Sequence, residues 1–214
     1  MKIVIPEAVK EFTRIQCNGE EAYTNDKIVD KILSYCSSPK TVLEIGCGIG
    51  RGSVLLDKKL HTKPKFYLLD GDKNERGQIC GVNWNSRTDF YNSLVATRTF
   101  CEANGLSDFV LLDAEKDWQR DLPKFDLIFS LKSIGFHWPI DLYLSQLLPY
   151  VAEKTILAFE LRWLNLSKGN EEQLLEWGEW NFQQLKCISL NHYTIVGCDL
   201  CTNSLLVLRG ADDV

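Results

Sequence analysis

The chain repeats short apolar runs, and each run ends at a glycine, an acid or a polar loop. Runs with the length of a buried strand lie at 41–45, 65–70, 108–113, 124–131 and 154–161. Nearly continuous apolar runs of this kind are typical of parallel strands that are covered on both faces. They are separated by stretches with helical spacing of apolar residues, at 50–60, 91–106, 140–151 and 171–185. The pattern therefore predicts strands that alternate with helices.

The helix expected at 91–106 has a candidate buried face. Its apolar and small residues are spaced for one side of a helix at Leu94, Val95, Thr99 and Ala103. Gly105 fits a C-terminal stop, because glycine adopts the left-handed conformation that often ends helices.

The two ends of the chain differ from its middle. Residues 1–40 form an N-terminal segment that we expect to be helical, above all at 26–36. The last two apolar runs, 192–200 and 203–210, have no helix between them, so they should pair antiparallel. These features predict an α/β fold: a doubly wound, seven-stranded, mostly parallel sheet with a C-terminal antiparallel hairpin and helices on both faces. The main domain would occupy 41–214.

Composition narrows the range of partners. The chain has 214 residues, a net charge of -5, 45% hydrophobic residues and no long basic run. A surface that neutralises phosphates usually shows a basic patch, so nucleic acid is disfavoured as a partner. No signal peptide and no apolar stretch of 18 residues is visible, so we expect a cytoplasmic protein without a membrane span.

The eight cysteines are expected to be reduced thiols in the core, because several lie inside apolar periodic segments. The C-x-x-C pair Cys198 and Cys201 has no second pair that would complete a metal site.

A glycine-rich turn follows the first predicted strand in "TVLEIGCGIGRG". Gly46, Gly48 and Gly50 allow a ligand to lie against the backbone, and the next helix starts there. The dinucleotide fingerprint G-x-G-x-x-G needs a third glycine where Arg51 stands. Glu44 would repel a pyrophosphate and would suit a cation. A dinucleotide-binding oxidoreductase stays open as an alternative.

"VLEIGCGIG" resembles the first motif of class I S-adenosylmethionine-dependent methyltransferases, and the similarity extends over about residues 41–209 through "FYLLD", "LLDAEKDW" and "FDLIFSL". The resemblance implies that S-adenosylmethionine is the cofactor and S-adenosylhomocysteine the product. It implies that Asp70 holds the ribose hydroxyls, with Asp72 as a weaker alternative, and that Asp113 and Ala114 contact adenine. The cofactor residues expected from the motifs are Glu44, Gly46, Cys47, Gly48, Gly50, Asp70, Asp113, Ala114 and Ser130.

The segment 130–139 should border the methyl acceptor. It lacks the Asp/Asn-Pro-Pro-aromatic tetrad of base amino methylation, and Ser130 stands where metal-dependent relatives place an Asp, so no metal is expected. His137 has the intrinsic pKa of a general base, and a substrate contact or a packing role are its alternatives. Lys132 could steer an anionic substrate, and a solvated lysine is the alternative.

The acceptor itself is expected to be a small polar molecule, such as a sugar, methylated on a hydroxyl. Residues 71–92 look like an insertion over the site. The substrate contacts expected there and elsewhere are Trp84, Tyr91, Trp138, Glu160 and Arg162. A catalytically silent subunit that binds S-adenosylmethionine stays open as well.

Overall fold

The computed structural model describes residues 3–10, 12, 26–72, 92–117, 121–131, 133–134, 140–160, 193–199 and 205–210. The helix expected at 171–185, the Cys198 side chain and Cys201 lie outside them. No described helix has the length and apolar character needed to cross a membrane.

The described strands are β1 (Thr41–Ile45), β2 (Lys65–Asp70), β3 (Phe109–Asp113), β4 (Leu127–Leu131), β5 (Ile156–Glu160), β6 (Tyr193–Asp199) and β7 (Leu205–Gly210). The α-helices are α2 (Asp26–Tyr35), α3 (Arg51–Lys59), α4 (Leu94–Ala103) and α5 (Ile140–Leu147). Short 3-10 turns form at η1 (Glu7–Val9) and η2 (Leu148–Tyr150). These elements confirm the predicted alternation up to β5. The bounds of β1 and β2 are as predicted, and the other described elements are shorter than predicted by a few residues.

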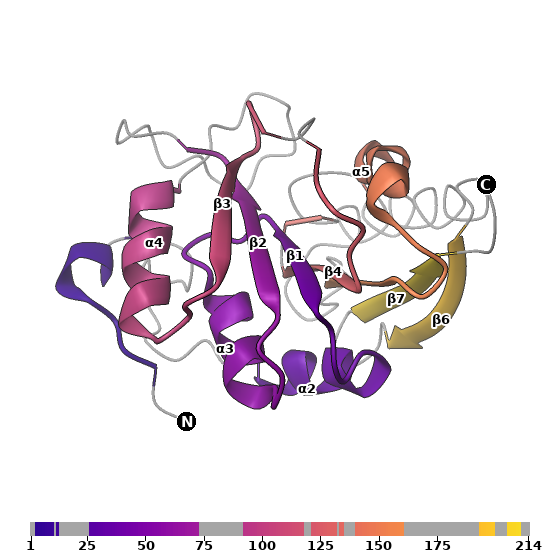
Figure 1. Cartoon of the computed structure of the whole chain (residues 1–214), viewed down its shortest axis with the longest axis horizontal. Helices are drawn as coiled ribbons and strands as arrows, with labels where there is room; N and C mark the ends of the chain where they lie inside the picture. Colours follow the sequence, from indigo (N-terminus) through magenta and orange to yellow (C-terminus); the bar gives the residue numbers. More distant parts are fainter. Residues whose placement is uncertain are drawn as a thin grey trace, which may run out of the picture.

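The seven strands form one sheet in the order β3-β2-β1-β4-β5-β7-β6 (Figure 1). Neighbours from β3 to β5 are parallel, whereas β7 runs antiparallel to both β5 and β6. The predicted mostly parallel sheet with a C-terminal hairpin is therefore confirmed. The order reverses between β1 and β4, which is where an open α/β sheet binds its ligand, at the carboxyl ends of the strands.

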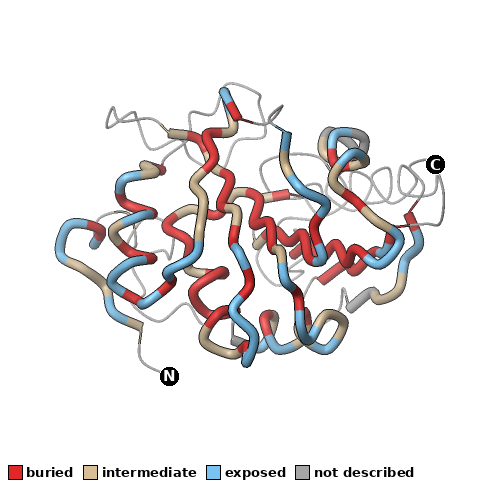
Figure 2. Tube along the Cα trace, in the orientation of Figure 1, coloured by how far each residue is buried: buried red, intermediate tan, exposed pale blue. Residues whose placement is uncertain are grey.

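Both faces of the sheet are covered, as the continuous apolar runs predicted. One core combines strand residues with side chains of α2, α3 and α4, and the other combines the opposite strand faces with α5. Figure 2 shows the central strands as buried over most of their length. Buried parallel strands need this cover because each face is apolar.

The prediction of which side of α4 is buried is wrong. Val95 is 65% exposed and Ala103 is also exposed, whereas Ala96, Thr97 and Phe100 are buried. The helix is rotated relative to the prediction, so that Phe100 enters the core and Thr97 faces the glycine turn. Apolar residues lie on more than one side of this helix, so the spacing alone did not decide which side is buried.

The segment before α2 is fastened to the end of α4. The Asn104 side chain accepts a hydrogen bond from the Val4 N–H and donates one to the Val4 carbonyl, both at 2.8 Å. Val9 is fully buried, and Ile3 and Ile5 pack against the same core. This part of the N-terminal segment therefore belongs to the packed structure.

Candidate functional site

The glycine turn lies at the carboxyl end of β1, where the sheet order reverses. Gly46, Gly48 and Gly50 have φ angles of 66°, 53° and 83°, a region that favours glycine. The Gly46 and Cys47 N–H groups both donate to the Leu69 carbonyl, at 2.8 and 3.1 Å. The turn is thereby tied to the end of β2, and α3 begins directly after it.

Asp70 ends β2 and holds the middle of the turn. Its carboxylate accepts the Gly48 N–H at 2.5 Å and the Gly71 N–H at 2.7 Å, one on each oxygen. Burial raises its pKa to about 6, although these two bonds act in the opposite direction. Each carboxylate oxygen can accept a further bond. The predicted contact to ribose hydroxyls is compatible with this arrangement and stays a prediction.

Glu44 turns out to be a structural partner of helix α3. Its Oε2 accepts the Ser53 N–H at 3.0 Å and the Ser53 hydroxyl at 2.6 Å. Ser53 is the third residue of α3, and the N-cap Gly50 offers no side chain for capping. Glu44 thus satisfies a helix N-terminal donor from the neighbouring strand. Nothing in the sequence spacing alone indicated that Ser53 would be its partner.

The Glu44 carboxyl group is enclosed by the core. The residue is 2% exposed, and burial raises its pKa to about 8, against the opposing effect of the Ser53 bonds. The charge of Asp70 adds to this increase. A Cβ added at Gly52 would collide with Glu44 Oε1 and crowd Leu131. The Glu44 carboxyl group therefore occupies the space that a side chain at position 52 would need.

Cys47 and Cys101 are buried thiols next to the turn. Burial raises the pKa of both, and in each case the charge of Glu44 adds to the increase. Both thiols are protonated at neutral pH as a result. For these two, the expectation of free thiols in the core is confirmed, and Cys36 is a partly exposed free thiol.

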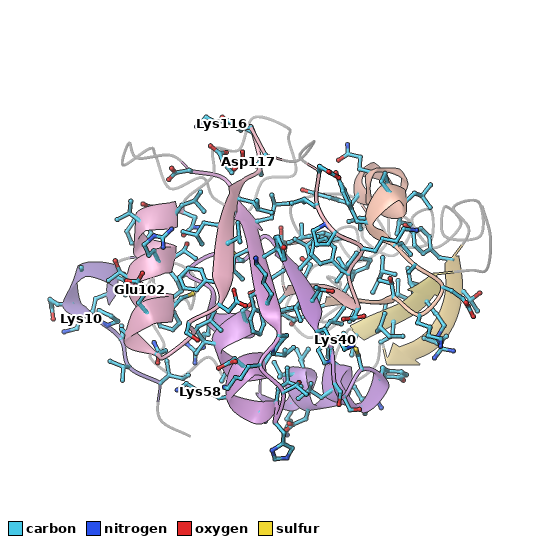
Figure 3. The ribbon with its side chains drawn as sticks, in the orientation of Figure 1. Lys10, Lys40, Lys58, Glu102, Lys116 and Asp117 are labelled. Carbon is cyan, nitrogen blue, oxygen red and sulfur yellow. The ribbon has the colours of Figure 1, made fainter. Side chains whose placement is uncertain are left out.

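Asp113 lies beside Asp70, because the two residues are paired in the β2–β3 register. Its carboxylate accepts bonds from the Glu115 N–H at 3.0 Å and from Lys116 Nζ at 2.6 Å. Burial alone would raise its pKa, but the bonds and the Lys116 charge outweigh this and hold the pKa below its usual value. Lys116 is exposed at the top of the molecule in Figure 3, beyond the end of β3. Ala114 donates its N–H to the Asp70 carbonyl at 2.8 Å.

Asp72 and Ser130, two other predicted residues, have structural partners. Asp72 accepts the Leu94 N–H at 3.1 Å, so it caps the start of α4. Ser130 is fully buried in β4, and its Oγ accepts the Ile134 N–H at 3.1 Å. Ser130 therefore has an observed structural partner, and its cofactor contact stays a prediction.

Glu160 is the last residue of β5 and is buried. It is opposite Leu131 of β4 in the register, and Leu131 lies on the face of the sheet that carries α3. The predicted contact of Glu160 with a polar acceptor stays a prediction.

The remaining predicted residues lie outside the described residues. This set consists of Lys132, His137, Trp138, Trp84, Tyr91 and Arg162. In the parts of the chain that are described, no three His, Cys, Asp or Glu side chains form a group that could hold a metal ion.

Comparison with known proteins identifies the fold. No family model and no curated protein matches the chain. Among solved structures, the SAH-bound methyltransferase PaMTH1 of Podospora anserina matches with a TM-score of 0.58 and 15% identity, over 97% of this chain and 89% of that one. The O-methyltransferase of Bacillus cereus in complex with SAH matches with a TM-score of 0.58 and 12% identity, over 97% and 92%.

A third match is a dimethyltransferase of 8-amino-8-demethyl-D-riboflavin (RosA) from Streptomyces davawensis, with a TM-score of 0.54 and 13% identity, over 86% of this chain and 54% of that one. The chain has the Rossmann-like fold of class I S-adenosylmethionine-dependent methyltransferases. The acceptors differ among proteins with this fold, so the fold leaves the acceptor of this chain undetermined.

Proposed function

We propose that this protein is an S-adenosylmethionine-dependent methyltransferase that acts on a hydroxyl of a small polar molecule. The observation that carries the choice of cofactor is the contact of Glu44 with Ser53 at the N-terminus of α3. A dinucleotide places its pyrophosphate against such a helix N-terminus, which offers free N–H groups and a partial positive charge. Here the buried carboxyl group of Glu44 already takes the Ser53 N–H and fills the space beside Gly52.

The charges at the edge of the sheet support the same cofactor. Asp70 and Asp113 lie side by side at the ends of β2 and β3. Two neighbouring carboxyl groups disfavour an anionic ligand and favour one that carries an α-ammonium and a sulfonium. When bound, this cofactor would supply a methyl group on a positively charged sulfur.

The chain's own residues would position the two reactants. The glycine turn would carry the amino acid part of the cofactor, Asp70 would accept from its ribose hydroxyls, and Asp113 with Ala114 would border its base. Alignment of acceptor oxygen, methyl carbon and sulfur supplies most of the acceleration in such a transfer, worth up to roughly 7–11 kcal/mol in ideal cases.

Ligand binding tests the proposal directly. Calorimetry of the wild-type protein with S-adenosylhomocysteine and, separately, with NAD should give binding of the first and none of the second. Binding of NAD alone would replace the proposal with the oxidoreductase alternative. Binding of S-adenosylhomocysteine without methylation of any hydroxylated substrate in a broad panel would favour a catalytically silent subunit.

Asp70→Ala should weaken the binding of S-adenosylhomocysteine by about 1–3 kcal/mol, because it leaves ribose hydroxyls without their acceptor. Asp72→Ala is the matched control, since Asp72 is two residues away and bonds the Leu94 N–H. Asp72→Ala should lower the free energy of unfolding by about 0.5–2 kcal/mol, because a helix cap is lost. It should leave the affinity for S-adenosylhomocysteine nearly unchanged. Equal affinity of Asp70→Ala and wild type would remove Asp70 from the cofactor site.

His137 is the proposed general base for the acceptor hydroxyl, on the strength of its sequence position after β4 and its intrinsic pKa. His137→Ala should remove the group that titrates near neutral pH from the pH dependence of turnover, with unchanged S-adenosylhomocysteine affinity. A pH profile of the variant that is identical to the wild-type profile would make His137 a packing residue. The measurement is S-adenosylhomocysteine release with an active hydroxylated acceptor.

A further inference from the structure

Two buried polar side chains of the α4 region hold the carbonyl of Gly48. Asn92 Nδ2 donates to this carbonyl at 2.9 Å, and Thr97 Oγ1 donates to it at 2.7 Å. Asn92 is 2% exposed and Thr97 is fully buried. Neither residue was predicted as part of the site from the sequence, because they lie 44 and 49 positions away from the glycine.

Asn92, Thr97 and the Gly48 carbonyl are joined by hydrogen bonds. Asn92 Nδ2 also lies 3.1 Å from Thr97 Oγ1, so its two protons reach the carbonyl and the hydroxyl. The single hydroxyl proton of Thr97 has two acceptors within reach, the Gly48 carbonyl at 2.7 Å and the Ser93 carbonyl at 3.2 Å. When the proton is on the nearer one, the Gly48 carbonyl accepts bonds from Asn92 and Thr97, and the Cys47 thiol is a third, longer donor at 3.4 Å.

Gly48 is therefore fixed on both sides. Asp70 holds the N–H of the peptide before it, and the Asn92–Thr97 pair holds the carbonyl of the peptide after it. Together these bonds define the two backbone dihedrals of Gly48, whose φ is 53°. A glycine without such partners would exchange among several conformations.

We propose that Asn92 and Thr97 are positioning residues for the cofactor: they hold the backbone of Gly48 in the conformation against which the cofactor binds. This inference rests on the proposed function and extends it to two residues that the motifs of the fold do not include. The pair acts through the turn and makes no contact with the reacting atoms. Its loss should therefore reduce affinity for the cofactor by loosening Gly48 and, through it, the Asp70 carboxylate.

Thr97→Val removes the hydroxyl and keeps the shape of the side chain. We expect it to weaken S-adenosylhomocysteine binding about 3- to 10-fold, the effect of losing one net hydrogen bond, and Asn92→Ala to do the same or more. Thr97→Ser, which restores the hydroxyl, should return the affinity to within about 2-fold of wild type. Exchange of the Gly48 amide proton with solvent, followed by NMR, should speed up in Thr97→Val.

Thr99→Val is the matched control. Thr99 is on the same helix, and its hydroxyl donates to the Val95 carbonyl four residues earlier, at 2.9 Å, away from the turn. It should leave both the affinity and the Gly48 amide unchanged. All measurements are made well below the unfolding temperature of each variant, which circular dichroism defines.

The outcomes separate this inference from the proposed function. If wild type binds S-adenosylhomocysteine and Thr97→Val and Asn92→Ala bind it equally well, the pair is merely structural and the inference fails while the function stands. If wild type binds none, both fail. A loss in Thr97→Val that Thr97→Ser also shows would assign the effect to packing and would equally overturn the inference.

Discussion

Glu44→Gln should make the protein progressively more stable than wild type as the pH rises from about 4.5 to about 8. The Glu44 carboxyl group is buried beside α3, and burial raises its pKa to about 8 from an ordinary value of 4.5. A carboxyl group that holds its proton more tightly in the folded state favours folding at low pH. This contribution is fully present below 4.5 and is lost as the pH rises through 8.

Glutamine keeps an oxygen for Ser53 and has no proton to lose. Any fixed cost of its amide is the same at every pH, so the change of the stability difference with pH reports Glu44 alone. One pKa unit corresponds to about 1.4 kcal/mol. The difference in the free energy of unfolding between Glu44→Gln and wild type should therefore grow by about 3–5 kcal/mol as the pH rises from about 4.5 to about 8. Urea unfolding at pH 4.5, 6, 7 and 8.5 measures it.

The control for this experiment is Glu102→Gln, the same chemical change at an exposed side chain of α4 that is labelled in Figure 3. It should show no comparable growth with pH. If the free energies of unfolding of Glu44→Gln and wild type differ by the same amount at every pH, Glu44 titrates like an exposed acid and the prediction is wrong. Because a bound cation favours ionised Glu44, S-adenosylmethionine, which carries a sulfonium, should stabilise wild type more than Glu44→Gln near pH 8.

The second large effect is expected for Gly46→Ala. Gly46 has a φ of 66°, and a Cβ added there would collide with the Ser133 side chain. An L-residue in the left-handed region costs about 1–2 kcal/mol, and overpacking adds about 1–3 kcal/mol. The loss of about 2–5 kcal/mol is a large share of the 5–15 kcal/mol that typically stabilises a domain.

Gly105→Ala separates the two contributions. Gly105 has a φ of 82°, and no atom lies within 4 Å of the Cβ that would be added there. It should therefore cost only the conformational part, about 1–2 kcal/mol. Denaturant unfolding of both variants gives the difference, and S-adenosylhomocysteine affinity should fall in Gly46→Ala alone. Equal destabilisation would show that Ser133 moves aside at no cost.

The elements of the sheet could be read from the sequence because their signals are local. A run such as Thr41–Ile45, followed by alternating glycines, specifies a buried strand and a tight turn within a dozen residues. The acids Asp70 and Asp113 could be placed at the same edge, because parallel strands end together. The hairpin of β6 and β7 followed from the missing helix between two strands.

The polar partners could not be read in this way. The Ser53 N–H of α3 donates to Glu44, which belongs to β1. Asn92 and Thr97 bond the Gly48 carbonyl from 44 and 49 positions away in the chain. Such bonds depend on which side of a helix faces the turn, and the apolar pattern of α4 gave the wrong side. The burial of Glu44 likewise depends on α3 lying over β1.

Local patterns were thus enough to predict the succession of strands and helices, the glycine turn and the acids that follow the strands, since each depends on residues close together in the chain. What those acids bond, which side of α4 is buried and how Gly48 is held became visible only in the folded protein. These depend on side chains from separate elements meeting in a water-poor interior, where every polar group needs a partner, and the identity of that partner is set by packing.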